Sequence, residues 1–275
     1  MPSFHAPDGT ELFYQDQGDG PPVLALAGLT RNSTDFDYVA PHLAHTRLIR
    51  LDYRGRGKSA WSGPETYTIP TEAGDAIALL DHLGLKQAAV LGTSRGGLIG
   101  MLLAVIAKPR LTGVCLVDIG PELKPDGLAA IADYIGRNPS QRTYAQAIQM
   151  RATLMAGFED VPEARWADEV RKHYAETSEG LVINYDPSLR DAVLAAGTQP
   201  VPDLWPMFDA MAGLPLALIR GANSDLLTPA TTAEMARRRP DMIWTDVPGR
   251  GHVPFLDEPQ AVDVLARWTA MLDGA

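Results

Sequence analysis

Short apolar runs alternate with stretches of helical periodicity along most of the 275-residue chain. Apolar runs bounded by turn residues are typical of buried strands, and their alternation with helices predicts a parallel sheet. The dipeptide Asp8-Gly9, between two apolar segments, is a hairpin turn signal. The pattern therefore predicts an α/β fold with a mostly parallel, twisted sheet of roughly eight strands and helices on both faces. The expected strands cover residues 4–6, 12–15, 23–27, 48–51, 88–91, 114–117, 216–219 and 243–246.

Four helices of this core have recognisable faces or ends. Gly84 and Pro109 stand where the first two helices should end. A proline suits the first turn of a helix because the N–H that it lacks would have no partner there. The apolar faces and helix starts are Ala73-Ile77-Leu80, Leu98-Leu102-Val105, Pro229 through Met235, and Pro259 through Met271.

The alternation stops after the sixth strand. Residues 121–206 contain no convincing strand, and their apolar positions follow helical spacing. The helix faces are Leu128-Ile131-Ile135, Ile148-Ala152-Met155 and Trp166-Val170-Tyr174. We therefore expect a core of residues 1–120 and 207–275 with a helical cap at 121–206. At the carboxyl edge of an open sheet such a cap would cover a ligand crevice. The alternative is a peripheral helical subdomain that takes no part in binding.

One strand runs directly into the turn Gly92-Thr93-Ser94-Arg95-Gly96, and a predicted helix follows at once. A Gly-x-Ser-x-Gly sequence between strand and helix matches the nucleophile elbow. Its glycines suit a turn too tight for side chains, and the serine lies at a helix N-terminus, where developing negative charge is stabilised. Taken alone, the motif also fits an N-cap serine. The strand–turn–helix context favours Ser94 as a nucleophile.

A serine nucleophile needs a base, and the base needs an acid that orients it. His252 lies in a glycine-rich loop directly after the last predicted strand, at the carboxyl edge of the sheet, where it can reach Ser94. Two acids follow strands at the same edge. Asp225 precedes His252 by one helix and one strand and is the preferred acid, and Asp118 is the alternative.

The oxyanion hole requires two backbone N–H groups aimed at the tetrahedral oxygen. One should come from Arg95, the residue after the nucleophile, and the other from the loop after the strand at 23–27. In that loop Gly28 permits a bend, so the Leu29 N–H is the expected second donor.

Four motifs in order resemble the capped α/β-hydrolases over nearly the whole chain outside the insertion. They are the elbow, the D-x-R-G-x-G-x-S-like loop at residues 52–59, the segment 221–229 and the segment 251–259. The resemblance implies a serine hydrolase, since the branches with an aspartate nucleophile do not fit. One departure is Ala27-Gly28, where the family usually has His-Gly. That histidine is commonly structural in the oxyanion loop, so the family pattern does not specify the hydrogen bonding of this loop here.

The composition of the chain limits the kinds of partner that it is expected to bind. The formal charge of −10 disfavours nucleic acid, and no cysteine, histidine and carboxylate spacing indicates a metal. No dinucleotide fingerprint follows a strand, so no cofactor is expected. The single cysteine, the absence of an N-terminal signal pattern and the lack of a long apolar run predict a cytoplasmic protein without membrane contact.

The expected partner is a small-molecule substrate that is mainly apolar. It would also carry a carboxylate if the side chain of Arg95 or Arg31 entered the pocket, although pairing of these arginines with Asp118 or Asp35 is favoured. Formation of a homodimer is left open. The expected reaction is hydrolysis of a small carboxylic ester or lactone through an acyl-enzyme. The alternatives are a C–C (meta-cleavage-type) hydrolase or an amidase with the same triad. Two further alternatives belong to another functional class: a ligand receptor, and a cofactor-free lyase or oxygenase on this fold.

Overall fold

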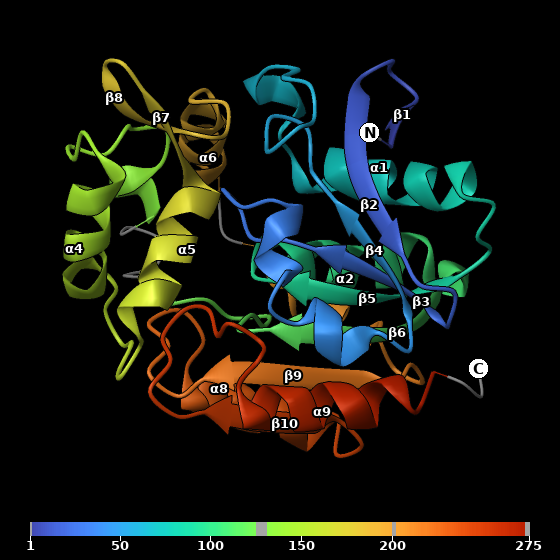
Figure 1. Ribbon diagram of the computed structural model, residues 1–275. Coiled ribbons are helices and arrows are strands. Elements are labelled where there is room, and N and C mark those ends of the chain that lie inside the picture. The colour runs from blue at the N-terminus through green and yellow to red at the C-terminus, as the bar shows by residue number, and fades with distance from the viewer. Residues whose placement is uncertain (1, 125–130, 200–201, 273–275) are drawn as a thin grey trace.

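An eight-stranded sheet forms the centre of the molecule, in the order β1-β2-β4-β3-β5-β6-β9-β10 (Figure 1). The computed structural model describes residues 2–124, 131–199 and 202–272. β1 pairs antiparallel with β2, and β2 with β4, whereas the remaining neighbours are parallel. The strands are β1 (Ser3–His5), β2 (Glu11–Gln17), β3 (Pro22–Leu26), β4 (Arg47–Leu51), β5 (Ala88–Thr93), β6 (Leu111–Val117), β9 (Leu216–Gly221) and β10 (Ile243–Val247). The predicted fold class and mostly parallel sheet are confirmed.

Both faces of the central strands are buried, which is why they read as continuous apolar runs. On β3, Leu24 and Leu26 face one apolar layer, and Val23 and Ala25 face the other. The first layer packs under α1 (Ile69–His82), α2 (Arg95–Ile106), α7 (Trp205–Asp209) and α8 (Pro229–Arg238). The second packs under α9 (Pro259–Thr269), η1 (Ser33–Phe36) and η2 (Ala40–Leu43). The short helices η3 (Pro64–Thr66) and η4 (Lys108–Arg110) lie in connections.

Between β6 and β9 the chain leaves the sheet and forms a separate group of elements, here called the inserted segment. It contains α4 (Tyr144–Leu154), α5 (Glu163–His173), β7 (Tyr174–Thr177), β8 (Gly180–Ile183) and α6 (Leu189–Gly197). In Figure 1 these elements lie together beside the sheet, at the end toward which the arrowhead of β9 points. Leu128 of the predicted helix faces lies outside the described residues.

The expectation that this segment contains no strand is wrong. β7 and β8 pair as an antiparallel hairpin, with Tyr174 opposite Ile183. Tyr174, which was assigned to a helix face, therefore begins a strand, and α5 ends one residue earlier. The hairpin was missed because most of β7 is exposed and lacks the alternation of apolar and polar residues that identifies a half-buried strand.

Two features of the sequence are structural. Cys115 is fully buried on β6, where burial raises the pKa of its thiol. Glycine at position 100 lets α2 approach the sheet, since a Cβ there would lie 3.2 Å from Val90 Cγ1 and 3.4 Å from Val114 Cγ1.

Among the described helices, none has the length and apolar character that crossing a bilayer demands.

Trp268 anchors α9 to the sheet. Its side chain is fully buried, and its indole N–H donates to the carbonyl of Pro215 over 3.3 Å. We expect Trp268→Ala to lower the free energy of unfolding by about 3–5 kcal/mol, because it leaves a large cavity in the layer under α9. Urea denaturation measures the loss. Met271→Ala is the control, because that side chain is 40% exposed. Equal losses in the two variants would show that this layer does not depend on the indole.

Candidate active site

Ser94 occupies the turn between β5 and α2 in a strained conformation. Its φ of 50° and ψ of −112° lie outside the regions that side chains favour, which costs on the order of 1–3 kcal/mol. The Ser94 N–H donates to the Val117 carbonyl over 2.9 Å, and its carbonyl accepts from the N–H groups of Gly97 and Leu98. These bonds on both sides hold the turn in its strained shape.

The two glycines of the motif are required by close backbone contacts. A Cβ on Gly92 would lie 2.5 Å from the Gly96 carbonyl oxygen. A Cβ on Gly96 would lie 2.0 Å from the carbonyl oxygen of Leu26, on the neighbouring strand β3. Real side chains do not approach backbone so closely, so the turn admits only glycine at both positions.

His252 reaches Ser94 from the loop after β10. Its Nε2 lies 3.0 Å from Ser94 Oγ, and its Nδ1 lies 2.7 Å from Oδ2 of Asp118. The ring therefore bridges the serine hydroxyl and a carboxylate. With the proton on Nδ1 donated to Asp118, Nε2 is left as an acceptor for the serine proton.

Asp118 directly follows β6 and is fully buried. Besides His252, its carboxylate accepts from the Gly221 N–H over 2.8 Å and from Ser224 Oγ over 2.6 Å. Its own N–H donates to the Ile219 carbonyl over 2.7 Å, so the residue is fixed against β9. Three donors therefore face one carboxylate, whose oxygens accept all of these hydrogen bonds.

The structure contradicts the preferred assignment of Asp225 as the partner of His252. Asp225 is exposed, whereas the two residues that follow it, Leu226 and Leu227, are buried in the core and turn the aspartate outward. The residue before it, Ser224, points its hydroxyl at Asp118 instead. The alternative acid, Asp118, therefore occupies the place that the sequence analysis gave to Asp225.

The two expected oxyanion donors lie on segments next to Ser94. Arg95 is the first residue of α2, where backbone N–H groups have no partner within the helix. The loop carrying Leu29 passes close by, because a Cβ on Gly28 would lie only 3.9 Å from Ser94 Cβ. The Leu29 carbonyl accepts from Arg56 Nε over 2.9 Å, which fixes the loop from the far side. This contact holds the loop where the usual histidine is absent.

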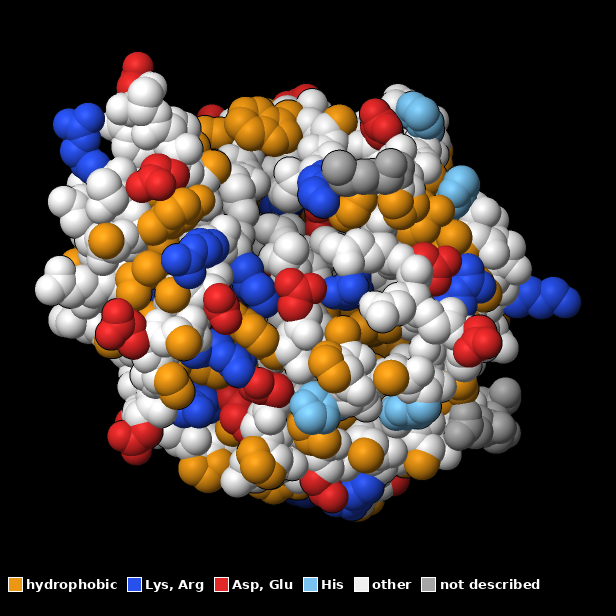
Figure 2. Space-filling model, in the orientation of Figure 1, with side chains coloured by type: hydrophobic (Ala, Val, Ile, Leu, Met, Phe, Trp, Pro, Cys, Tyr) orange, Lys and Arg blue, Asp and Glu red, His pale blue; other side chains and the backbone are white. Residues whose placement is uncertain are grey.

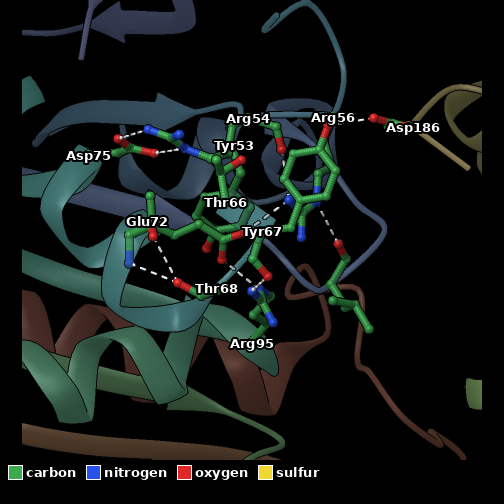
Figure 3. Close-up of polar contacts among 12 residues, drawn as sticks. Tyr53, Arg54, Arg56, Thr66, Tyr67, Thr68, Glu72, Asp75, Arg95 and Asp186 are labelled. Carbon is green, nitrogen blue, oxygen red and sulfur yellow. Dashed lines mark hydrogen bonds and ion pairs between the residues drawn. The ribbon is translucent and has the colours of Figure 1, made fainter. Parts of the chain in front are cut away.

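A buried carboxylate connects the two donor segments (Figure 3). Glu72 on α1 is fully buried, with Oε1 2.9 Å from Arg56 Nη1 and Oε2 2.5 Å from Arg95 Nε. Arg95 Nη2 also donates to the Tyr67 carbonyl over 2.9 Å. The expected pairing of Arg95 with Asp118 is therefore wrong, and the Arg95 side chain is held under α1. Burial lowers the pKa of Arg56, and the Glu72 carboxylate counteracts it.

The same region ties the inserted segment to the core. The Tyr67 hydroxyl donates to Asp186 Oδ2 over 2.5 Å, and the Asp186 N–H donates to the Gly55 carbonyl over 2.8 Å (Figure 3). Beside it Arg54 forms two parallel hydrogen bonds of 2.7 and 2.6 Å with Asp75, and both side chains are buried. The loop at residues 52–59 is therefore a rigid support between α1, the Leu29 loop and the inserted segment.

Arg31 lies on the other side of the Leu29 loop. Its Nε is 2.7 Å from Asp35 Oδ2, so the expected pairing of these residues is confirmed, and its Nη2 is 2.8 Å from Glu169 Oε2 on α5. Burial opposes the charge of Arg31, but the two carboxylates raise its pKa overall.

Two further residues of the inserted segment meet Arg31, and the sequence analysis did not single them out as a site. His173 Nδ1 lies 3.5 Å from Arg31 Nη1 and 3.4 Å from Nη2 of Arg151 on α4. Burial and the nearby charges of Arg31 and Arg151 hold the pKa of His173 well below its usual range, so the ring is neutral. The spacing of Glu169 and His173 along one face of α5 was the signal that could have indicated this cluster.

Charged side chains of both signs also gather on the outer surface where α5 meets the core (Figure 2). They line a groove of about 590 Å³, which includes Asp37, Lys58, Asp168 and Lys172. The Lys172 ammonium donates to the Thr34 carbonyl over 2.8 Å. Neither Ser94 nor His252 is among the lining residues, so this groove is separate from the candidate active site.

The buried carboxylate of Glu72 should dominate the stability of this region. Glu72→Gln keeps the shape but leaves Arg56 and Arg95 without their shared anion, so we expect a loss of about 3–5 kcal/mol in the free energy of unfolding. Urea denaturation measures it, and Glu65→Gln, at an exposed carboxylate on η3, should leave stability unchanged. If both variants were as stable as the wild type, the ion pairs would not be needed.

Comparison with known proteins identifies the family of the chain. Residues 23–263 match the family described as "Alpha/beta hydrolase family". A 3-hydroxybutyrate-oligomer hydrolase from Cupriavidus necator is 34% identical over 92% of this chain and 90% of its own length. A 2-(acetamidomethylene)succinate hydrolase from Mesorhizobium japonicum is 26% identical over 88% and 84%. The crystal structure of an alpha/beta hydrolase from Novosphingobium aromaticivorans superposes with a TM-score of 0.91 at 34% identity, covering 98% of this chain and 97% of that one.

Proposed function

The chain belongs to the alpha/beta hydrolase family, and on this premise we propose that it is a serine hydrolase that cleaves small carboxylic esters through an acyl-enzyme. The observation that carries the proposal is the continuous set of hydrogen bonds from Ser94 through His252 to Asp118. Ser94 is the nucleophile, His252 the general base and Asp118 the orienting acid. The triad acid is thus Asp118 and not Asp225.

The reaction follows from the roles of these groups. Ser94 Oγ attacks the ester carbonyl carbon as His252 Nε2 takes its proton, and Asp118 stabilises the imidazolium that forms. The N–H groups of Leu29 and Arg95 receive the oxyanion. When the intermediate collapses, the C–O bond to the alcohol breaks and His252 returns the proton to the leaving oxygen. Water then attacks the acyl-enzyme with His252 as base, which releases the acid and restores Ser94.

The substrate class is taken from the chemistry of the relatives. A 3-hydroxybutyrate oligomer is a chain of ester bonds, and the hydrolase acting on it, by its name, is 34% identical over most of both chains. We therefore favour a short linear ester of hydroxy acids over a lactone. The inserted segment lies beside the end of the sheet toward which β9 points (Figure 1), and we expect it to act as the lid of the substrate pocket.

The nucleophile can be tested directly. Ser94→Ala should abolish hydrolysis of p-nitrophenyl butyrate and of the linear 3-hydroxybutyrate dimer, because it removes the hydroxyl that lies 3.0 Å from His252 Nε2. A fluorophosphonate probe should label the wild type and not this variant. Thr93→Ser, at the preceding buried hydroxyl, is the matched control and should still be labelled. Labelling that survived Ser94→Ala would refute the assignment. An amide and a dienoic C–C substrate in the same panel distinguish the other hydrolase reactions.

The acid can be tested by a pair of like substitutions. Asp118→Asn should lower kcat on the order of 10⁴-fold, because an amide at this position favours the wrong tautomer of His252. Asp225→Asn should leave kcat within about twofold, since that side chain is exposed and is not hydrogen-bonded to the imidazole of His252. Steady-state kinetics on p-nitrophenyl butyrate give both values. If Asp225→Asn lowered kcat more than Asp118→Asn did, Asp225 would be the acid.

A further inference from the structure

The cluster of Arg31, Arg151 and His173 brings cationic groups from the core and from the inserted segment to one place. Arg31 comes from the loop after β3, Arg151 from α4 and His173 from the end of α5. Both guanidinium groups approach His173 Nδ1, at 3.5 and 3.4 Å. A guanidinium only donates hydrogen bonds, so the two contacts are hydrogen bonds in the tautomer of His173 whose Nδ1 is unprotonated.

The charges in this cluster are unevenly matched. Arg31 has two carboxylate partners, Asp35 and Glu169. Arg151 has none within ion-pair distance among the residues that the structure describes, and its Nε is buried without a hydrogen-bond partner. His173 Nε2 is likewise buried and unpartnered. Burial lowers the pKa of Arg151 and the charge of Glu169 counteracts it, so what the guanidinium lacks is a hydrogen-bonded anion rather than a nearby negative charge.

The cluster is next to the candidate nucleophile. A Cβ on Gly28 would lie 3.2 Å from Arg31 Cγ and 3.9 Å from Ser94 Cβ, so the stem of Arg31 and Ser94 flank the same glycine.

We propose that Arg151, supported by Arg31 and His173, binds a free carboxylate of the ester that Ser94 cleaves. This inference rests on the proposed function and adds the charge of the substrate to it. The Nε of Arg151 is buried without a hydrogen-bond partner, and the planar set of donors of its guanidinium fits a carboxylate. The ligand is therefore a linear ester acid, such as a hydroxy-acid dimer with its terminal carboxylate free. Arg95, which the sequence analysis also considered for this role, is occupied by Glu72.

The binding experiment uses the Ser94→Ala variant, so that no turnover occurs. Calorimetric titration compares the 3-hydroxybutyrate dimer acid with its terminal carboxamide, which has the same shape and no charge. The acid should bind on the order of 10- to 100-fold more tightly than the amide. Adding Arg151→Met should remove this preference, and Arg151→Lys should restore part of it. Equal binding of acid and amide to Ser94→Ala would overturn the inference.

A matched control separates this role from a structural one. Arg142→Met removes an exposed arginine of the inserted segment, whose backbone packs near Gly180 at the turn of the β7–β8 hairpin. It should keep the full preference for the acid. With Ser94 intact, Arg151→Met should raise KM for the dimer acid by a much larger factor than KM for p-nitrophenyl butyrate. A loss of equal size on both substrates, or a preference that persists in Arg151→Met, would contradict carboxylate binding.

The two proposals fail separately. If neutral esters are cleaved in a Ser94-dependent way but acid and amide are treated alike, the carboxylate site is refuted and the serine hydrolase stands. If no ester is cleaved by the wild type, the proposed function is refuted. The binding titration on Ser94→Ala then decides the carboxylate site without reference to turnover.

Discussion

The close approach of the β5–α2 turn to β3 is the constraint on which the site depends. Gly96 lies against the Leu26 carbonyl with no room for a Cβ, and this contact brings α2 up to the sheet directly after Ser94. The serine is thereby forced into a strained conformation that the bonds to Val117, Gly97 and Leu98 hold in place. Because β3 is adjacent, its following loop with Gly28 passes beside the serine. One steric fit thus sets the positions of the nucleophile and of both expected oxyanion donors.

Buried charges hold the parts around this turn together. Glu72 joins the guanidinium groups of Arg56 and Arg95, and Arg56 in turn holds the Leu29 carbonyl. Such ion pairs add little stability over apolar packing, but they define one arrangement, because any displacement would leave a buried charge unpaired. The same physical reasoning applies to Asp118, which is buried and accepts hydrogen bonds from three groups. Arg151 differs, because among the described residues it forms no ion pair and its Nε has no hydrogen-bond partner, which leaves its donors available to a ligand.

Much of the fold could be predicted because strands that are buried on both faces of the sheet appear in the sequence as continuous apolar runs. The eight strands, the helices of the core and the elbow at Ser94 follow from apolar runs, helical spacing and glycine positions. The pairing of Arg31 with Asp35 was also predictable, since residues four apart on a turn are neighbours. The β7–β8 hairpin was not, because its exposed side chains carry no burial signal.

The sequence by itself determined that a serine follows β5 in a strand–turn–helix context and that a histidine follows the last strand. Which acid meets that histidine was decided by the tertiary structure alone. Asp118 and Asp225 both follow parallel strands at the same edge, so chain order cannot separate them. Packing of Leu226 and Leu227 turns Asp225 to solvent, while Gly221 and Ser224 bind Asp118. The contact of Arg31 with His173 is likewise decided by packing, because it joins segments more than one hundred residues apart and the spacing along α5 relates His173 only to its own helix.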